Sequence, residues 1–444
     1  MKKTESEKSV SGKLVISVVL LAMLMFLSIE CASAATHYVN PGDSIQSAVN
    51  VANSGDTIIV RDGTYTENVD VNKLLTIRSE NGYENCIIQA ANSNNHAITI
   101  AANSVTINGF TVTGVTGNYK AGIYGASVEH CTISNNKAEY NDVGIYLYQS
   151  SSNIITDNII SNNDHISIYL DISCSNNEIS NNIISDNTGG GNILLHGHCS
   201  NNEIANNIFS NNECGIHIRW DSKNNIITKN TITSNGKGVR FSDGASDNIF
   251  YLNNFINNDQ NTVFDGYTPL TNIWKSPEKL SYSYNGDTFT NYMGNYWDDY
   301  TGSDGNGDGI GDTSYNMPGG NSDDYPLIEP FENYFDKTYL WVEINEELDA
   351  LIEEVNAATI TSNVKRTLVK KLEDAKALND KAHEQYEAGN IKNAKKELEK
   401  AKHKVELFEN TVNKAKKISP ADKESFLEKS GEIKDKIDAL IRTL

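Results

Sequence analysis

The residues whose types and spacing most clearly suggest chemistry lie at 304–312, which read DGNGDGIGD. Oxygen-bearing side chains alternate there with small residues, and Gly309 stands where a calcium-binding loop must turn sharply. A hard cation needs several oxygens that converge within one turn of chain, so this spacing predicts bound calcium. The predicted ligands are Asp304, Asn306, Asp308, Ile310 through its carbonyl oxygen, and Asp312.

One ligand of such a loop is missing, because its last position holds Tyr315 rather than a bidentate Glu. Nearby carboxylates that would replace it are Asp298, Asp299, Asp323 and Asp324. The alternative interpretation of the same stretch is a solvated turn rich in Asp and Gly.

A second set of residues recurs every 22 to 25 positions along short alternating apolar runs. Alternation places these side chains outward, in two neighbouring columns. One column is Tyr124, Tyr146, Tyr169, Leu194, His217 and Arg240, and the next is Tyr148, Asp171, His196, Arg219 and Ser242. Aromatic rings stack on sugar faces, and Arg forks onto carboxylates. We therefore predict sugar-binding residues at Tyr124, Tyr146, Tyr148, Tyr169, His217 and Arg219. The alternative is an ordinary strand surface, on which Tyr is favoured anyway.

Catalysis by these columns is a weaker hypothesis. A glycoside hydrolase needs close carboxylates, and only Asp171 lies on the columns, so hydrolysis is disfavoured. A lyase or epimerase needs a base and a group that neutralises a carboxylate. His196 or His217 could serve as the base, with Arg219 or Arg240 as the neutralising group.

The elements that must position these residues come from an internal repeat. CSNNEISNNIISDN at 174–187 returns as CSNNEIANNIFSNN at 199–212. Each repeat holds three short alternating runs, which predict three strands per turn of a parallel β-helix with about nine turns. One column of corner residues that tolerate the left-handed conformation and stack is Asn158, Asn182, Asn207, Asn230 and Asn253. The core column beside it is Ile160, Ile184, Phe209, Ile232 and Phe255.

Composition divides the rest of the chain. Residues 36–63 are predicted to cap the solenoid with a short helix whose apolar face is Ile45, Ala48, Val49 and Val51. Repeats occupy 64–259, and a second cap with the calcium loop occupies 260–339. Residues 340–444 are rich in Lys, Glu, Ala and Leu at helical spacing, which predicts a small all-α bundle.

The opening SIQSAV, the segment GDTIIV, the N-x-I-x-x-N repeats and the ending GNYWDDYTGSDGNGDGIGD resemble the NosD-like right-handed β-helix proteins of the pectate-lyase-like superfamily. The resemblance covers about residues 36–330 and implies the fold far more than a function. The helical tail resembles the FIMAH-type module of secreted proteins. The NosD resemblance also implies copper, for which His196, His198 and His217 are the candidate ligands. Copper is nevertheless not expected, because no spaced Met or Cys cluster supports it.

The N-terminus predicts export. Lysines precede an apolar run at 14–27 and an A-x-A site at 32–34, so residues 1–35 form a signal peptide or an uncleaved anchor. The net charge of −21 arises mostly before residue 341 and disfavours nucleic acid and anionic membrane surfaces as partners. Cys174 and Cys199 hold equivalent places in adjacent repeats and form either a disulfide or a buried thiol pair.

The sequence therefore predicts a secreted or cell-surface β-helix protein with a structural calcium ion. It is expected to bind a glycan or another surface polymer, and its helical tail to bind another protein. The competing hypothesis is a polysaccharide lyase or epimerase that acts on acidic sugars. A copper-binding accessory protein is the lesser alternative.

Overall fold

The structure is a computed structural model that describes residues 34–265, 271–335, 338–415 and 417–444. It forms two compact units. One comprises residues up to 277, 293–303 and 311–326, and the other comprises 278–292, 304–310 and 327–444. The predicted cap at 260–339 is thus shared between the two units. Of the predicted signal peptide or anchor at 1–35, residues 1–33 lie outside the described part.

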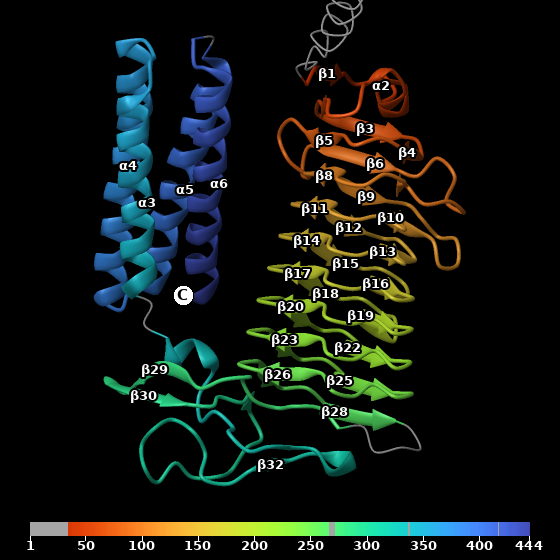
Figure 1. Cartoon of the computed structure of the whole chain (residues 1–444), viewed down its shortest axis with the longest axis vertical. Helices are drawn as coiled ribbons and strands as arrows, with labels where there is room; N and C mark the ends of the chain where they lie inside the picture. Colours follow the sequence, from red (N-terminus) through yellow and green to blue (C-terminus); the bar gives the residue numbers. More distant parts are fainter. Residues whose placement is uncertain (1–33, 266–270, 336–337, 416) are drawn as a thin grey trace, which may run out of the picture. The chain divides into compact units, whose positions relative to one another are not determined.

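The first unit is a parallel β-solenoid of about ten turns, which confirms the predicted fold and adds about one turn (Figure 1). The first sheet is β1 (Thr36–Val39), β2 (Thr57–Val60), β5 (Thr76–Ser79), β8 (Thr106–Asn108), β11 (Thr132–Ser134), β14 (Ile154–Thr156), β17 (Glu178–Ser180), β20 (Glu203–Ala205), β23 (Ile226–Thr228) and β26 (Ile249–Tyr251). The second is β3 (Gly63–Thr66), β6 (Cys86–Gln89), β9 (Thr111–Thr113), β12 (Lys137–Glu139), β15 (Ile159–Ser161), β18 (Ile183–Ser185), β21 (Ile208–Ser210), β24 (Thr231–Thr233), β27 (Asn254–Ile256) and β31 (Tyr296–Trp297). The third is β4 (Val69–Val71), β7 (Ile98–Ile100), β10 (Ala121–Ala126), β13 (Val143–Tyr148), β16 (Ile166–Asp171), β19 (Gly191–His196), β22 (Cys214–Arg219), β25 (Lys237–Ser242) and β28 (Gln260–Asp265).

The additional strands come from segments predicted only as caps, β1 at the N-terminal end of the first sheet and β31 at the C-terminal end of the second. Strands β1 and β2 pair in parallel within the first sheet, and α2 (Ile45–Val51) connects them. The Ser44 hydroxyl accepts a hydrogen bond from the Ser47 N–H and so caps this helix. Ile45 and Val49 are buried as expected, whereas Val51 is 70% exposed and does not belong to the buried face.

Each turn points one apolar side chain per short strand into a continuous core. The column from Ile160 through Ile184, Phe209 and Ile232 to Phe255 is paired in register and fully buried, as the sequence predicts. Neighbouring strands of a sheet lie about 4.8 Å apart, so side chains that share a column are in contact.

Buried asparagines form ladders along the corners. The Asn182 Oδ1 accepts from the backbone N–H of Asn158, and its Nδ2 donates to the Ile155 carbonyl. The sequence predicts the left-handed conformation for the stacked asparagines, and this is wrong. The left-handed residue at these corners is the one before the stacked asparagine, such as Asn181 with φ 58°. The reason is that the ladder amide must point inward to meet its neighbours, which leaves the preceding residue to make the bend.

At the C-terminal end of the solenoid, side chains from a less regular segment provide the last acceptors of the asparagine ladders. In the ladder that contains Asn182 and Asn253, the Asn295 Oδ1 accepts from the Asn253 N–H, and the Asp323 carboxylate accepts from the Asn295 N–H. Asp323 is fully buried, and burial raises the pKa of its carboxyl to about 6. The short elements of this segment are η1 (Pro318–Gly320) and the strand pair β32 (Tyr315–Asn316) and β33 (Ser322–Asp323).

The second unit contains the predicted helices. They are α3 (Thr338–Ala357), α4 (Ser362–Glu387), α5 (Ile391–Lys414) and α6 (Pro420–Thr443), and they share one apolar core that includes Leu348, Leu372, Leu398 and Phe408. The hairpin β29 (Leu280–Tyr284) and β30 (Asp287–Asn291) and the turn η2 (Phe331–Tyr334) belong to the same unit. Within the described ranges, no helix has the length and apolar character needed to span a bilayer.

The asparagine ladder gives the first prediction. Asn182→Ala leaves the Asn158 N–H without its acceptor and the Ile155 carbonyl without the Asn182 amide. Each unsatisfied buried group costs about 1–3 kcal/mol, so we expect unfolding in urea to show a loss of roughly 2–6 kcal/mol. Asn118→Ala is the control, because Asn118 is exposed and outside the ladders. Equal stability of both variants would contradict a supporting role for the ladder.

Candidate functional site

The third sheet carries both predicted columns of side chains. Strand pairing places Tyr124 beside Tyr146, then Tyr169, Leu194, His217 and Arg240. The neighbouring column follows the same register and contains Tyr148, Asp171, His196 and Arg219. The placement expected from the alternation is therefore present, because six-residue strands pair without slippage across these turns.

Part of the first column is more covered than its outward direction implies. Tyr169, Leu194 and His217 are each only 5% exposed. Tyr169 and Leu194 form a small outer apolar cluster with Ala121, Val143 and Ile166. These residues are therefore mostly covered and offer little surface to a ligand. A ligand would instead contact the second column and the corner that follows it.

Four side chains of the two columns are joined by hydrogen bonds. The Tyr146 hydroxyl donates to the Asp171 Oδ2 at 2.8 Å, and the His196 Nδ1 lies 2.6 Å from the Asp171 Oδ1. The Tyr169 hydroxyl is 3.1 Å from the same His196 nitrogen. Burial is the largest cause that raises the pKa of both tyrosines, so they remain neutral, and Asp171 holds the imidazole in one orientation.

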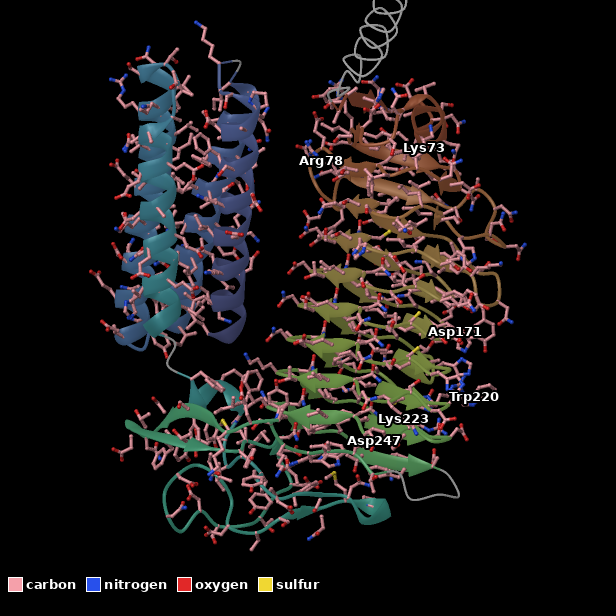
Figure 2. All side chains as sticks on the ribbon, viewed as in Figure 1. Lys73, Arg78, Asp171, Trp220, Lys223 and Asp247 are labelled. Carbon is pink, nitrogen blue, oxygen red and sulfur yellow. The ribbon has the colours of Figure 1, made fainter. Side chains whose placement is uncertain are left out.

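Aromatic residues at corners and loops extend this network, and the repeat pattern of the sequence does not predict them. The His96 ring stacks on Tyr124 with centroids 4.0 Å apart, and the Trp220 ring lies 4.6 Å from His196. Trp220 is 53% exposed, and Figure 2 shows it with Asp171 at the same edge of the solenoid. These residues fall outside the alternating runs. The only signal in the sequence was that Trp220 directly follows a predicted ligand-binding residue, Arg219.

A cavity of about 190 Å³ opens beside this network. We call it the arginine pocket, and its lining is Tyr119, His165, Ile166, Gly190, Gly191, Leu194, His217, Arg219 and Arg240. The Arg219 Nε is buried and has no hydrogen-bond partner within the described ranges, whereas the Arg240 Nε donates to the Asp265 Oδ2 at 2.7 Å. Burial, aided by both arginines, lowers the pKa of His217 to about 3 and keeps this ring neutral.

The predicted calcium loop is folded on its first carboxylate. The Asp304 Oδ1 accepts from the N–H groups of Gly307 and Asp308, and its Oδ2 accepts from the Gly309 N–H. The stretch 304–310 belongs to the second unit, whereas Asp312 belongs to the first, where its N–H donates to the Ser303 carbonyl. Among the described residues, no three His, Cys, Asp or Glu side chains converge as a metal site.

The three candidate copper ligands do not combine into a site. The His196 Nδ1 is occupied by Asp171 and Tyr169, and the His217 Nε2 lies 3.2 Å from the Ser242 hydroxyl. His198 is at an exposed corner with φ 61°. Since no three His, Cys, Asp or Glu side chains converge among the described residues, these histidines do not form a copper centre there.

Cys174 and Cys199 are buried free thiols, not a disulfide. Each donates to backbone carbonyl groups, Cys174 to Leu147 and Cys199 to Leu170, both at 3.4 Å. Of the two alternatives left open by the sequence, the structure has the thiol pair, and these sulfur atoms lie inside the solenoid core.

The family follows from a comparison with known proteins. Residues 49–217 and 108–302 match the family described as periplasmic copper-binding protein (NosD). The chain belongs to the NosD family. In this member the matched residues include the repeats of the solenoid, so the resemblance seen in the sequence is confirmed. The copper in the family's description has no corresponding ligand set in the described residues.

Other similarities of this NosD-family chain are partial. It is 40% identical over 124 residues to a "Cell surface glycoprotein" of Methanothermus fervidus, which covers 26% of this chain and 20% of that protein. Among solved structures, an alginate lyase from Paenibacillus sp. str. FPU-7 has a TM-score of 0.35 at 17% identity, and covers 54% of this chain and 97% of its own. A pectate lyase has a TM-score of 0.39 at 14% identity, with 52% and 78% covered.

The burial of His217 gives the second prediction. Its folded pKa of about 3 lies below the usual 6.5, so its contribution to stability is present above pH 6.5 and is lost as pH falls toward 3. The charged groups that act on it are Arg219, Arg240, Lys237 and Asp265. Between these pH values, the wild type should lose up to about 1.4 kcal/mol per pH unit more than His217→Gln in urea unfolding. Exposed His198→Gln should follow the wild type, and parallel pH profiles for all three proteins would refute this explanation.

Proposed function

We propose that this NosD-family chain is an exported cell-surface protein whose third sheet binds a glycan or another surface polymer. The observation that carries the proposal is an exposed Trp220 ring beside His196, with Arg219 next to it in the chain. An exposed ring supplies a stacking face, and a guanidinium supplies several donors. The partial relative named as a cell surface glycoprotein supports the proposed location.

The conformation of Trp220 supports a role in binding rather than in folding. Its φ is 55°, and the equivalent corner one turn earlier holds Gly197 with φ 77°. A left-handed conformation costs an L-residue about 1–2 kcal/mol relative to glycine. A large exposed aromatic side chain at such a corner contributes little to stability, so binding is the better explanation of its presence.

Elimination or epimerisation of an acidic sugar is the second candidate function. It is favoured by the Asp171–His196 contact, since an imidazole oriented through Nδ1 can use its other nitrogen as a base. His217 is the weaker candidate, because a pKa of about 3 leaves it little basicity. Incubation with uronate polysaccharides, followed by ultraviolet absorbance for unsaturated ends and NMR for epimerised residues, tests this candidate. Turnover that survives His196→Gln would exclude His196 as the base.

The third prediction tests glycan binding. Trp220→Gly removes the stacking face while relaxing the backbone, so affinity for a bound polysaccharide should fall about two- to tenfold without loss of thermal stability. Trp220→Tyr should retain most of the affinity. Ile273→Ala is the matched control, because Ile273 is also exposed but lies beside the first sheet. A glycan array identifies the ligand, and calorimetry then measures each variant. Unaltered binding by Trp220→Gly would place the ligand elsewhere.

We also propose that the loop at 304–312 holds a structural calcium ion. Its support is the chain spacing, together with the carboxylates of Asp304 and Asp308, the amide of Asn306 and the carbonyl of Ile310 within seven residues. The hydrogen bonds that Asp304 accepts already fold this stretch back on itself.

The fourth prediction tests calcium binding. An ion that binds only the folded form stabilises it by about 2.7 kcal/mol at a hundredfold excess over its dissociation constant. Chelator should therefore lower the unfolding temperature of the full chain and expose this loop to protease. Asp308→Ala should remove the calcium response, and Asp287→Ala, an exposed carboxylate of β30, should keep it. If calorimetry shows no calcium binding by the wild type, the proposal is wrong and the loop is an acidic turn without a metal.

A further inference from the structure

The arginine pocket is lined by positively charged side chains, although the chain as a whole is strongly negative. The chain has a net charge of −21, yet no Asp or Glu lines this pocket. Arg219 and Arg240 are two of the four arginines between residues 34 and 335, the others being Arg61 and Arg78. A guanidinium stays protonated at any physiological pH, so the lining is cationic.

Arg219 is the less satisfied of the two arginines. Its Nε is buried without a partner, and a buried donor that lacks an acceptor costs free energy. Arg240 is held at its Nε by Asp265, which fixes its direction. The pocket thus combines one oriented guanidinium with one that has an unmet donor, and an anion with two oxygens matches that arrangement.

The remaining lining favours a group carried on a sugar ring. The neutral His217 can donate or accept a hydrogen bond without adding charge. A Cβ at Gly191 would lie 3.1 Å from the His217 Cβ, so the glycine keeps this wall open. At roughly 30 Å³ per water, 190 Å³ holds about six waters, enough for an anionic substituent and the ring atoms next to it.

We propose that the arginine pocket receives the anionic substituent of a sugar unit, a uronate carboxylate or a sulfate ester, so that this surface selects acidic over neutral glycans. The inference rests on the proposed glycan binding and adds its specificity. Trp220 would stack on the polymer while Arg219, its neighbour in the chain, binds the charge.

The test compares each of a panel of uronate polysaccharides with its carboxyl-reduced form, and each sulfated one with its desulfated form, by calorimetry on the full chain. The wild type should bind the acidic form of at least one pair and bind its neutral partner at least tenfold more weakly. Arg219→Gln should lower affinity for the acidic form tenfold or more, and Arg219→Lys should lose less, because it keeps the charge without the fork. Arg78→Gln removes the same charge from the first sheet and should have no effect.

Thermal unfolding separates binding from folding in these variants. Arg219→Gln should unfold no earlier than the wild type, because it removes a donor that has no partner in the folded protein. If it does unfold early, Arg240→Gln serves as the second variant with the same expected loss of affinity.

The possible results separate acidic-sugar selection by the pocket from glycan binding itself. Equal binding of acidic and neutral forms, or full affinity in both arginine variants, overturns the inference and leaves glycan binding standing. No binding to any polysaccharide overturns the proposed glycan binding and the inference together. Free acetate or sulfate that binds as tightly as the polymer, with Trp220→Gly unaffected, makes the pocket a simple anion site and overturns its role in sugar selection.

Discussion

Buried asparagine amides link successive turns of the solenoid from Phe110 onward, and most of the structure depends on this link. Each amide accepts a backbone N–H from one turn and donates to a carbonyl of that turn, as Asn207 does with Asn182 and Ile179. The bend of a parallel β-helix leaves backbone groups that no strand partner reaches, and burial makes them costly when unpaired. The ladders satisfy such groups where they run, which permits strands of only three residues there.

This constraint divides the surface into parts that must repeat and parts that are free to vary. Corners with a ladder residue require a left-handed residue and then Asn, so Asn181, Asn206 and Lys229 differ little in their backbone. The corner after the third sheet starts without a ladder amide and holds such different residues as Ile172, Gly197 and Trp220. The proposed site lies there because that corner and the six-residue strands before it tolerate chemical variety.

The sequence predicted what periodicity controls and missed what depends on single loops. The register of Ile184 under Phe209 and of Asp171 beside His196 follows from repeat spacing and strand alternation, and both are present. The low exposure of Tyr169 follows from the side chains packed around it, and the repeat period does not predict that packing. Trp220 likewise depends on the geometry of one corner, and the unpaired Arg219 Nε depends on the side chains around the arginine pocket. The site's columns were therefore predictable, whereas its cavity was not.

The contrast between ladder and pocket explains how an unsatisfied group can persist in this fold. The ladder leaves Asn182 with partners for both its oxygen and its nitrogen, and ten stacked turns share one core. An unfavourable group such as the Arg219 Nε is tolerated because turns on either side hold the backbone rigid. Rigidity of this kind also prevents the pocket from collapsing to pair Arg219 internally. A ligand anion can then supply the missing acceptor without reorganising the protein, which is the condition under which a binding site gains most from each contact.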